Sequence, residues 1–352
     1  MKTDSTTRVF LILFAVLGLA ACGGGGGGGG GGTNNTGGGG PPAGPWTQQL
    51  GTTSPDEAFG VATDAAGNVY MTGYTAGGLD GNVNAGSTDL VVVKYSANGN
   101  KLWTKQLGST PIASLSSGSD VATGIATDTD GSAYVTGHTY YAGLDGNTSA
   151  GGWDLFVVKY DTSGAKLWTR QLGTAMDDVA FGIATDAVGN VYVTGRTDAG
   201  LDGNPYAGGY DLFVVKYDTN GNKLWTKQLG TDMDDVATGI AIAAGTVYVA
   251  GHTESGLDGN THAGAYDLFV VKFAAQGKPC SPIPVFPPCE VQPKLWTRQL
   301  GTAMDDVATG IATDADGNAY VTGYTAGSLD GNTSAGEHDL FVVKYDANGV
   351  KQ

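Results

Sequence analysis

Short hydrophobic runs separated by polar turns fill the chain from Trp46 to its end. In a representative stretch, residues 179–186, 190–197, 211–218 and 223–230 each have the composition of a strand. Runs such as V-Y-V-T and L-F-V-V do not fit a helical period. The turns D-A-V-G-N and D-T-N-G-N contain glycine and asparagine, which tolerate the positive φ of tight hairpins. The pattern predicts an all-β domain built from units of four antiparallel strands.

This four-strand unit recurs five times, with a period of roughly 57 residues. The fifth unit ends at Gln352, where each earlier unit continues into L-W-T, and residues 46–51 supply a matching fourth strand at the other end of the chain. Radial repetition of four-stranded units is the architecture of a β-propeller, and a shared strand removes the exposed edge of an open array. We therefore predict a five-bladed propeller over residues 46–352, in which the N-terminal strand completes the last blade. A solenoid is the alternative, but it would need distinct capping repeats.

The repeated strings D-V-A-x-G-I-A-T-D-x-x-G-N-x-Y-V-T-G and D-L-F-V-V-K-Y-D-x-x-G-x-K-L-W-T resemble the bacterial SBBP beta-propeller repeat. The resemblance covers nearly all of residues 46–352. That family's name implies seven blades, and this chain has five repeats; the resemblance implies no single activity. The segment V-K-Y-D-x-x-G-x-K-L-W also resembles the tryptophan-docking motif of quinoprotein propellers. This second resemblance implies a structural, blade-docking role for Trp46, Trp103, Trp168, Trp225 and Trp296, and it does not extend to a quinone site.

The first 45 residues differ from the repeats. Residues 1–21 combine Lys2 and Arg8 with an apolar run over 9–20 that is too short for a membrane span, as in a signal peptide. L-A-A-C then resembles the bacterial lipobox, which implies a lipid on Cys22. An aspartate directly after the lipidated cysteine is associated with retention at the inner membrane, and this chain has Gly23 at that position. We therefore expect the protein at the outer membrane or the cell surface. Residues 22–45 are glycine-rich and read as a flexible tether.

The folded domain is acidic. The chain has 18 Lys and Arg against 34 Asp and Glu, a formal net charge of −16, which disfavours nucleic acid and anionic lipid as partners. The charge is compatible with divalent cations, with cationic partners or simply with solubility. We expect a monomeric domain that meets the membrane through its lipid and binds a glycan, a protein or another envelope component.

A proline-rich insertion over residues 275–293 interrupts the fourth unit and contains Cys280 and Cys289. Two cysteines on a short excursion of an exported protein predict a disulfide. Only Glu290 lies nearby as a further ligand, so metal binding is disfavoured.

Two sets of aspartates are expected on the rim that carries the long loops. The first precedes each innermost strand, and the second belongs to the motif L-D-G-N-x-x-A-G-x-x-D. Each set could hold Ca²⁺ through its carboxylates, or could accept backbone N–H groups as part of the scaffold. The first set is Asp56, Asp120, Asp178, Asp235 and Asp306; the second is Asp80 with Asp89, Asp145 with Asp154, Asp202 with Asp211, Asp258 with Asp267, and Asp330 with Asp339.

A lysine also recurs among apolar residues of every third strand, where we expect an Asp–Lys bridge. These lysines are Lys94, Lys159, Lys216, Lys272 and Lys344.

Catalysis finds little support in the sequence. The histidines lack metal-ligand spacing, and no G-x-S-x-G elbow is present. We therefore expect a tethered, non-enzymatic binding or display module. It would need no cofactor, although it could bind Ca²⁺. The alternatives are a polysaccharide hydrolase or lyase with carboxylates in the central channel, and a subunit of an envelope assembly complex. For the enzyme, the non-repeated acids Glu57, Glu254 and Glu337 would break the symmetry that near-identical units impose. The four histidines are His138, His252, His262 and His338.

Overall fold

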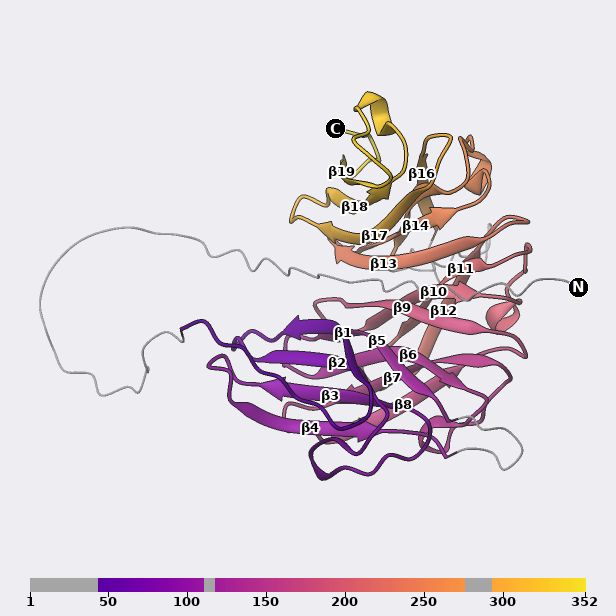
Figure 1. Cartoon of the computed structure of the whole chain (residues 1–352). Helices are drawn as coiled ribbons and strands as arrows, with labels where there is room; N and C mark the ends of the chain where they lie inside the picture. The colour runs from indigo at the N-terminus through magenta and orange to yellow at the C-terminus, as the bar shows by residue number, and fades with distance from the viewer. Residues whose placement is uncertain (1–43, 111–117, 276–292) are drawn as a thin grey trace, which may run out of the picture.

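The computed structural model describes residues 44–110, 118–275 and 293–352. The described chain is all-β and forms five antiparallel sheets in sequence order (Figure 1). The first sheet contains β1 (Asp56–Thr63), β2 (Val69–Thr75), β3 (Asp89–Tyr95) and β4 (Lys101–Leu107). The second contains β5 (Asp120–Thr127), β6 (Ala133–Tyr140), β7 (Trp153–Tyr160) and β8 (Lys166–Leu172). The third contains β9 (Asp178–Thr185), β10 (Val191–Thr197), β11 (Asp211–Tyr217) and β12 (Lys223–Leu229).

The fourth sheet contains β13 (Asp235–Ala243), β14 (Thr246–Thr253), β15 (Asp267–Ala274) and β16 (Lys294–Leu300). The fifth contains only three strands, β17 (Asp306–Thr313), β18 (Ala319–Thr325) and β19 (Asp339–Tyr345). Consecutive strands pair within each sheet, as the hairpin turns predict. The expected all-β class and the four-stranded antiparallel unit are therefore confirmed.

The first strand of every sheet lies on the inside of the array. β1 packs against β5, β5 against β9, β9 against β13, and β13 against β17. A glycine in each of the first four of these strands, such as Gly124 in β5, lies beside the next sheet, and a Cβ placed on Gly124 would be 3.2 Å from the side chain of Ile183. All five strands contribute to the walls of one cavity of about 150 Å³, formed by residues such as Thr238, Gly239 and Ile240. The centre of the array is thus small and mostly apolar.

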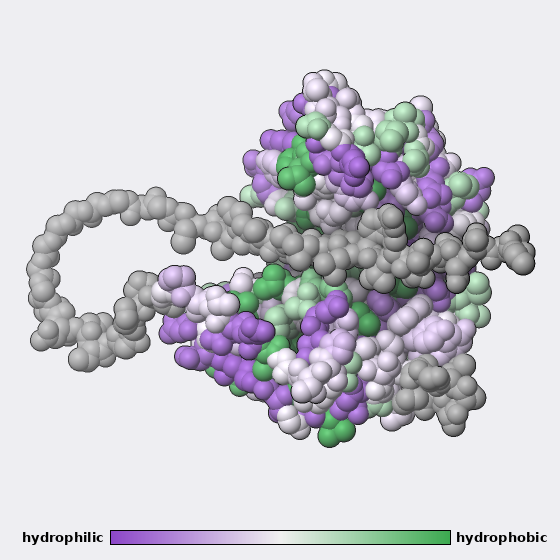
Figure 2. Space-filling model, in the orientation of Figure 1, coloured by the Kyte–Doolittle hydropathy of each residue, from purple (hydrophilic) through white to green (hydrophobic). Residues whose placement is uncertain are grey.

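The first and fifth sheets do not join in the structure. Figure 1 shows β17–β19 at the top and β1–β4 at the bottom, and Figure 2 shows hydrophobic surface on both the upper and the lower half on this side. Val61 of β1 is 41% exposed, whereas its equivalents Ile125 and Ile240 are 6% and 9% exposed. On the edge of β19, Leu340 is 93% exposed, while the equivalent Leu90 is fully buried. Residues 46–50 form no strand, so the predicted closure of the ring is not observed.

Two of the expectations concern cysteines that lie outside the described residues. Cys22 precedes them, and Cys280 and Cys289 lie in the gap within the insertion, so lipidation and the disulfide stay predictions. Within the described part of the chain, no helix has the length and hydrophobicity needed to span a membrane.

Candidate functional site

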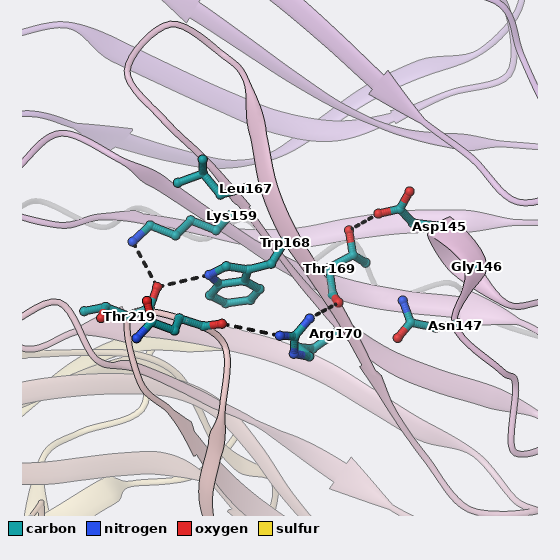
Figure 3. A pocket seen from close by; sticks show the side chains of 10 residues that line it. Asp145, Gly146, Asn147, Lys159, Leu167, Trp168, Thr169, Arg170 and Thr219 are labelled. Atoms are coloured by element: carbon teal, nitrogen blue, oxygen red, sulfur yellow. Dashed lines mark hydrogen bonds between the residues drawn. The ribbon is translucent and has the colours of Figure 1, made fainter.

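A groove of about 860 Å³ lies at the outer edge of the junction between the second and third sheets (Figure 3). Its floor is the indole of Trp168, whose Nε1 donates a hydrogen bond to the carbonyl of Thr219 in the next sheet at 3.1 Å. Lys159 donates to the same carbonyl at 3.3 Å, and Arg170 donates to the carbonyl of Gly221 at 2.7 Å. These polar groups are therefore already engaged in joining two sheets.

The tryptophan contact recurs along the array. The carbonyl of Thr162 accepts hydrogen bonds from both Trp103 and Lys94. The carbonyl of Ala347 likewise accepts from Trp296 and Lys272. The blade-docking role that the resemblance implied for the tryptophans agrees with this geometry. Trp225 lies in β12, and at its junction the carbonyl of Ala275 accepts a hydrogen bond from Lys216.

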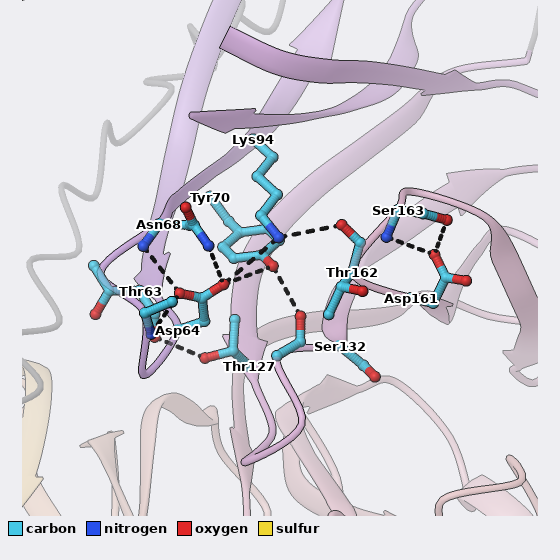
Figure 4. A network of polar contacts seen from close by, with 12 residues as sticks. Thr63, Asp64, Asn68, Tyr70, Lys94, Thr127, Ser132, Asp161, Thr162 and Ser163 are labelled. Carbon is cyan, nitrogen blue, oxygen red and sulfur yellow. Dashed lines mark hydrogen bonds and ion pairs between the residues drawn. The ribbon is translucent and has the colours of Figure 1, made fainter. Parts of the chain in front are cut away.

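The lysines of the third strands form a second inter-sheet network (Figure 4). Lys94 lies 3.6 Å from the carboxylate of Asp64 and 4.7 Å above the ring of Tyr70. The hydroxyl of Tyr70 donates to Asp64 at 3.2 Å and to the carbonyl of Gly131 in the next sheet at 2.8 Å. The predicted Asp–Lys bridge is confirmed here and in two further pairs, Lys159 with Asp128 and Lys216 with Asp186.

The first aspartate of every L-D-G-N loop has a structural partner. Asp145, for example, has a positive φ of 56°, pairs with Lys166 and accepts the hydroxyl of Thr169 at 2.7 Å. The following Asn147 donates from its side chain to the carbonyl of Leu144 at 2.8 Å and closes the turn. The equivalent aspartates Asp80, Asp202, Asp258 and Asp330 pair with Lys101, Lys223, Lys294 and Lys351. These contacts hold the loop in its conformation.

The second aspartate of each of the first four loops lies beside the first-set aspartate of the next sheet. Asp154 and Asp178 are both fully buried and flank the segment formed by Gly173 and Thr174. Oδ2 of Asp178 accepts the backbone N–H of Thr174 at 2.5 Å and its hydroxyl at 2.9 Å. Oδ2 of Asp154 accepts the side-chain amide of Gln171 at 2.7 Å, and its Oδ1 lies directly against Gly173.

The same arrangement recurs at three further junctions. The pairs are Asp89 with Asp120 around Gly108 and Ser109, Asp211 with Asp235 around Gly230 and Thr231, and Asp267 with Asp306 around Gly301 and Thr302. Asp56 and Asp339 belong to the two sheets that do not join. The two sets thus meet pairwise between sheets, and the two acids of one loop have different partners.

Crowding of two buried carboxyl groups changes their acidity. Burial raises the pKa of Asp178 to about 6 despite hydrogen bonds from Thr197 and Thr174, and the charge of Asp154 adds to the increase. Burial likewise raises the pKa of Asp235 to about 6, with a contribution from Asp211. Among the described residues, no three His, Cys, Asp or Glu side chains form a group that could hold a metal ion.

The glycine between each pair of carboxyl groups should not tolerate a side chain. A Cβ on Gly230 would lie 1.9 Å from Oδ1 of Asp211, so Gly230→Ala must displace a buried carboxyl group. We expect the substitution to reduce the free energy of unfolding by about 1–3 kcal/mol in urea denaturation. Gly336→Ala is the matched control, because nothing lies within 4 Å of its Cβ position. Equal denaturation midpoints for the two variants would contradict the packing described for the pairs.

Unlike residues gather at one end of the second, third and fourth sheets, where β6, β10 and β14 end. His138 lies 4.6 Å from Trp153, ring centroid to ring centroid, and His252 lies 5.0 Å from Tyr266. Between them, the guanidinium of Arg196 lies 3.8 Å above the ring of Tyr210. The spacing of the histidines disfavours metal binding. Their aromatic partners were not predicted, because Trp153, Tyr210 and Tyr266 occupy one repeat position and could be found only by comparing the units.

The remaining acids and histidines are dispersed. Glu254 lies in the same region, and its hydrogen bond contributes to the raised pKa of Tyr266 after burial, the largest cause. Glu57 is exposed on β1, and Glu337 is exposed before β19. His338 stacks on Tyr324 in the fifth sheet at 4.8 Å. Nδ1 of His262 lies 3.4 Å from the carboxylate of Asp267.

Four-stranded sheets that repeat along the chain, with tryptophans of one sheet bonded to the next, place this protein in the class of β-propeller repeat proteins. The family model described as SBBP, beta-propeller repeat, matches residues 46–80, 102–143, 167–202 and 295–330. The chain therefore carries SBBP beta-propeller repeats at these four positions.

Other comparisons give distant relatives. The regulatory protein FlaEY of Caulobacter vibrioides is 27% identical over 297 residues, which cover 76% of this chain and 30% of that protein. The chain therefore spans about a third of that relative's length. A protein of unknown function from Bacteroides caccae is 13% identical, with a TM-score of 0.43, and the alignment covers 84% of this chain and 82% of that one. A gluconolactonase from Xanthomonas campestris is 11% identical, with a TM-score of 0.40 and coverage of 84% and 74%.

Proposed function

We propose that this protein is an exported, lipid-anchored, non-enzymatic binding module whose sheets form a closed five-bladed propeller. The binding role rests on a difference between the side chains that recur in every unit and those that do not. Residues that recur in every unit join one sheet to the next, whereas residues that differ between units gather at one rim. A contact that joins every pair of sheets needs the same residue in each repeat, whereas a contact with a ligand does not. The rim residues that differ between units are therefore the ones available to recognise a ligand.

The contacts of Trp46 support closure. Its Nε1 donates to the carbonyl of Ala97 at 3.2 Å, and its ring lies 5.8 Å from that of Tyr95 at 35°. Trp103 makes the same contacts with the next sheet, at 3.2 Å to Thr162 and 36° to the ring of Tyr160. Trp46 therefore already lies on the first sheet as the fourth strand of a preceding sheet would.

The missing parts of that preceding sheet match the fifth sheet. At other junctions the carbonyl that accepts the tryptophan also accepts a hydrogen bond from a third-strand lysine. In a closed ring, Lys344 would donate this second hydrogen bond to the carbonyl of Ala97. The bridge between Tyr345 and Lys351 starts a fourth strand on β19, which residues 46–50 would continue. Closure would bury the exposed edge of β19 and complete the pairing of Asp56 with Asp339.

The central cavity favours binding over catalysis. Its walls are the T-G-I segments and their equivalents, such as Thr123, Gly124 and Ile125, and no carboxylate lines it. A glycosidase would need two acids in unlike environments within reach of one bond. The repeated acids are instead engaged with backbone N–H groups, lysines or one another.

The full chain on a glycan array, with and without chelator, tests the proposal. We expect saturable binding without new reducing ends or unsaturated products in the bound glycans. Turnover of a bound glycan would overturn the non-enzymatic role. Loss of binding in chelator would show that a cation takes part.

Anchoring can be tested separately. Cys22→Ser should prevent lipidation, so the protein should move from the membrane fraction to the soluble fraction of the envelope. Fractionation under high salt measures the change, because salt removes electrostatic adsorption. The lipid anchor is refuted if the serine variant remains with membranes under those conditions.

A further inference from the structure

Two neighbouring positions vary strongly between the repeats. The first is the residue near the end of each second strand that lies between T-G (A-G in the fourth unit) and Thr, which hardly change. The residue before each third-strand aspartate varies as well, although the following D-L-F-V-V-K is nearly constant. In chain order the first position holds Tyr74, His138, Arg196, His252 and Tyr324, and the second holds Thr88, Trp153, Tyr210, Tyr266 and His338.

The structure brings these two positions together in the second, third, fourth and fifth sheets. In the three middle sheets, His138 and His252 contact the aromatic ring edge to face, and the guanidinium of Arg196 lies over the ring of Tyr210; these rings are partly exposed. We name the surface formed by these three residues and by Trp153, Tyr210 and Tyr266 the unlike rim. Tyr140 adds a further ring, 4.6 Å from that of Trp153.

Hydrogen-bonding groups accompany the rings. Nδ1 of His138, Nε of Arg196 and Nδ1 of His252 are buried and have no hydrogen-bond partner within the described residues. Burial, with a contribution from the charge of Arg196, lowers the pKa of both histidines to about 4, so both are neutral at pH 7. An uncharged imidazole can donate at one nitrogen and accept at the other.

Carboxylates complete the surface. Asp198 accepts a hydrogen bond from the hydroxyl of Tyr206 at 2.9 Å, and Asp234 accepts the backbone N–H of Tyr210 at 3.0 Å. Burial raises the pKa of Asp234, and the neighbouring Glu254 and Asp198 add to the increase while Arg196 opposes it. The surroundings of Arg196 are thus rich in acceptors and disfavour an anion.

We propose that the unlike rim binds an uncharged carbohydrate chain, an inference that rests on the proposed binding function. The C–H face of a sugar ring packs on an aromatic ring, while its hydroxyl groups need both donors and acceptors around it. Each of the three sheets offers such a ring next to a polar nitrogen group. The rim thus presents a repeated element to a polymer with a repeated unit. The acids around Arg196 select against acidic sugars by like-charge repulsion.

The test is affinity electrophoresis of the full chain in gels containing dextran, xylan, galactomannan or polygalacturonate. We expect retardation by at least one of the three neutral polymers and not by polygalacturonate. Trp153→Ala and Tyr210→Ala should each weaken binding by about tenfold or more, as expected when a central aromatic contact is truncated. Tyr210→Phe keeps the ring and should keep most of the binding.

Leu102→Ala, at an exposed position on the outer strand β4, is the control outside the rim and should bind as the parent does. Thermal unfolding of each variant separates lost binding from lost folding. Retardation by polygalacturonate alone, or by none of the polymers, overturns the proposal. Undiminished binding in folded Trp153→Ala and Tyr210→Ala shows that the rim is not the site, although the binding function stands. Hydrolysis of the polymer would instead contradict the binding function itself.

Discussion

Removal of residues 46–51 should lower the unfolding temperature strongly and promote aggregation. In the four complete sheets, a fourth strand covers the third strand, and Leu90 and Val92 are fully buried. Without such a strand, Leu340 and Val342 of β19 are 93% and 73% exposed. If residues 46–50 cover this edge, their loss also removes the Trp46 contact. We expect a loss of about 3–5 kcal/mol, comparable to truncation of a buried tryptophan.

A single substitution distinguishes closure from a general effect of the deletion. Gln171 donates to Asp154 at 2.7 Å and accepts the backbone N–H of Leu144 at 2.9 Å, so Gln171→Ala leaves buried polar groups without partners. Its equivalent in the N-terminal segment is Gln49, which would contact Asp339 only in a closed ring. Both alanine variants should therefore lose about 1–3 kcal/mol. Urea denaturation measures the two losses side by side.

One result of this comparison would contradict closure of the ring. If Gln49→Ala denatures at the same urea concentration as the parent, while Gln171→Ala is destabilised, the ring is open in solution. An open ring would leave β19 as an unprotected edge strand, and the protein should then associate in a concentration-dependent way.

The strands could be predicted from sequence because each unit combines β-patterned runs with turn residues at fixed offsets. The run predicted over 179–186 is β9 at Asp178–Thr185, and the one over 223–230 is β12 at Lys223–Leu229. Five repetitions of the same signal left little ambiguity about class. Closure could not be settled in this way, because it depends on contacts between the two ends of the array.

The aspartates show the limit of spacing as evidence. Asp145 and Asp154 lie nine positions apart in one loop, and this proximity suggested a shared ligand. In the structure, Asp145 pairs with Lys166, while Asp154 meets Asp178 of the next sheet. The packing of one sheet on the next decides these partners, and no spacing within a unit encodes it. The unlike rim is different, since comparison of the five units could have found it.

Two buried aspartates should stabilise the folded protein more at mildly acidic pH than at neutral pH. Asp178 and Asp235 have a folded-state pKa of about 6, above the usual value of 3.8, so folding favours their protonated forms. Their stabilising contribution is complete below about pH 4 and is lost as the pH rises to about 6. Each shift corresponds to about 3 kcal/mol at most. Hydrogen bonds from Lys101 and Thr104 lower the pKa of Asp80, and such groups lose stability below about pH 4. His138 and His252, whose pKa burial lowers to about 4, act in the opposite direction, because their contribution is lost as the pH falls from about 6.5 to about 4. The two effects are of similar size, so the contribution of the aspartates is measured as the difference between a variant and the parent.

Asp178→Asn with Asp235→Asn should remove the aspartates' contribution to the pH dependence and stabilise the protein at pH 7–8. The amide is uncharged, retains an acceptor for the backbone N–H of Thr174 or Thr231, and can donate to the neighbouring Asp154 or Asp211. We expect a gain at pH 8 of up to about 5 kcal/mol for the double variant and almost none at pH 4. Thermal unfolding at half-unit steps between pH 4 and 8 measures both. Asp232→Asn, at an exposed position, should leave the profile unchanged. A double variant that keeps the parent's slope between pH 4 and 6 would show that these buried carboxyl groups are not the protons exchanged on unfolding.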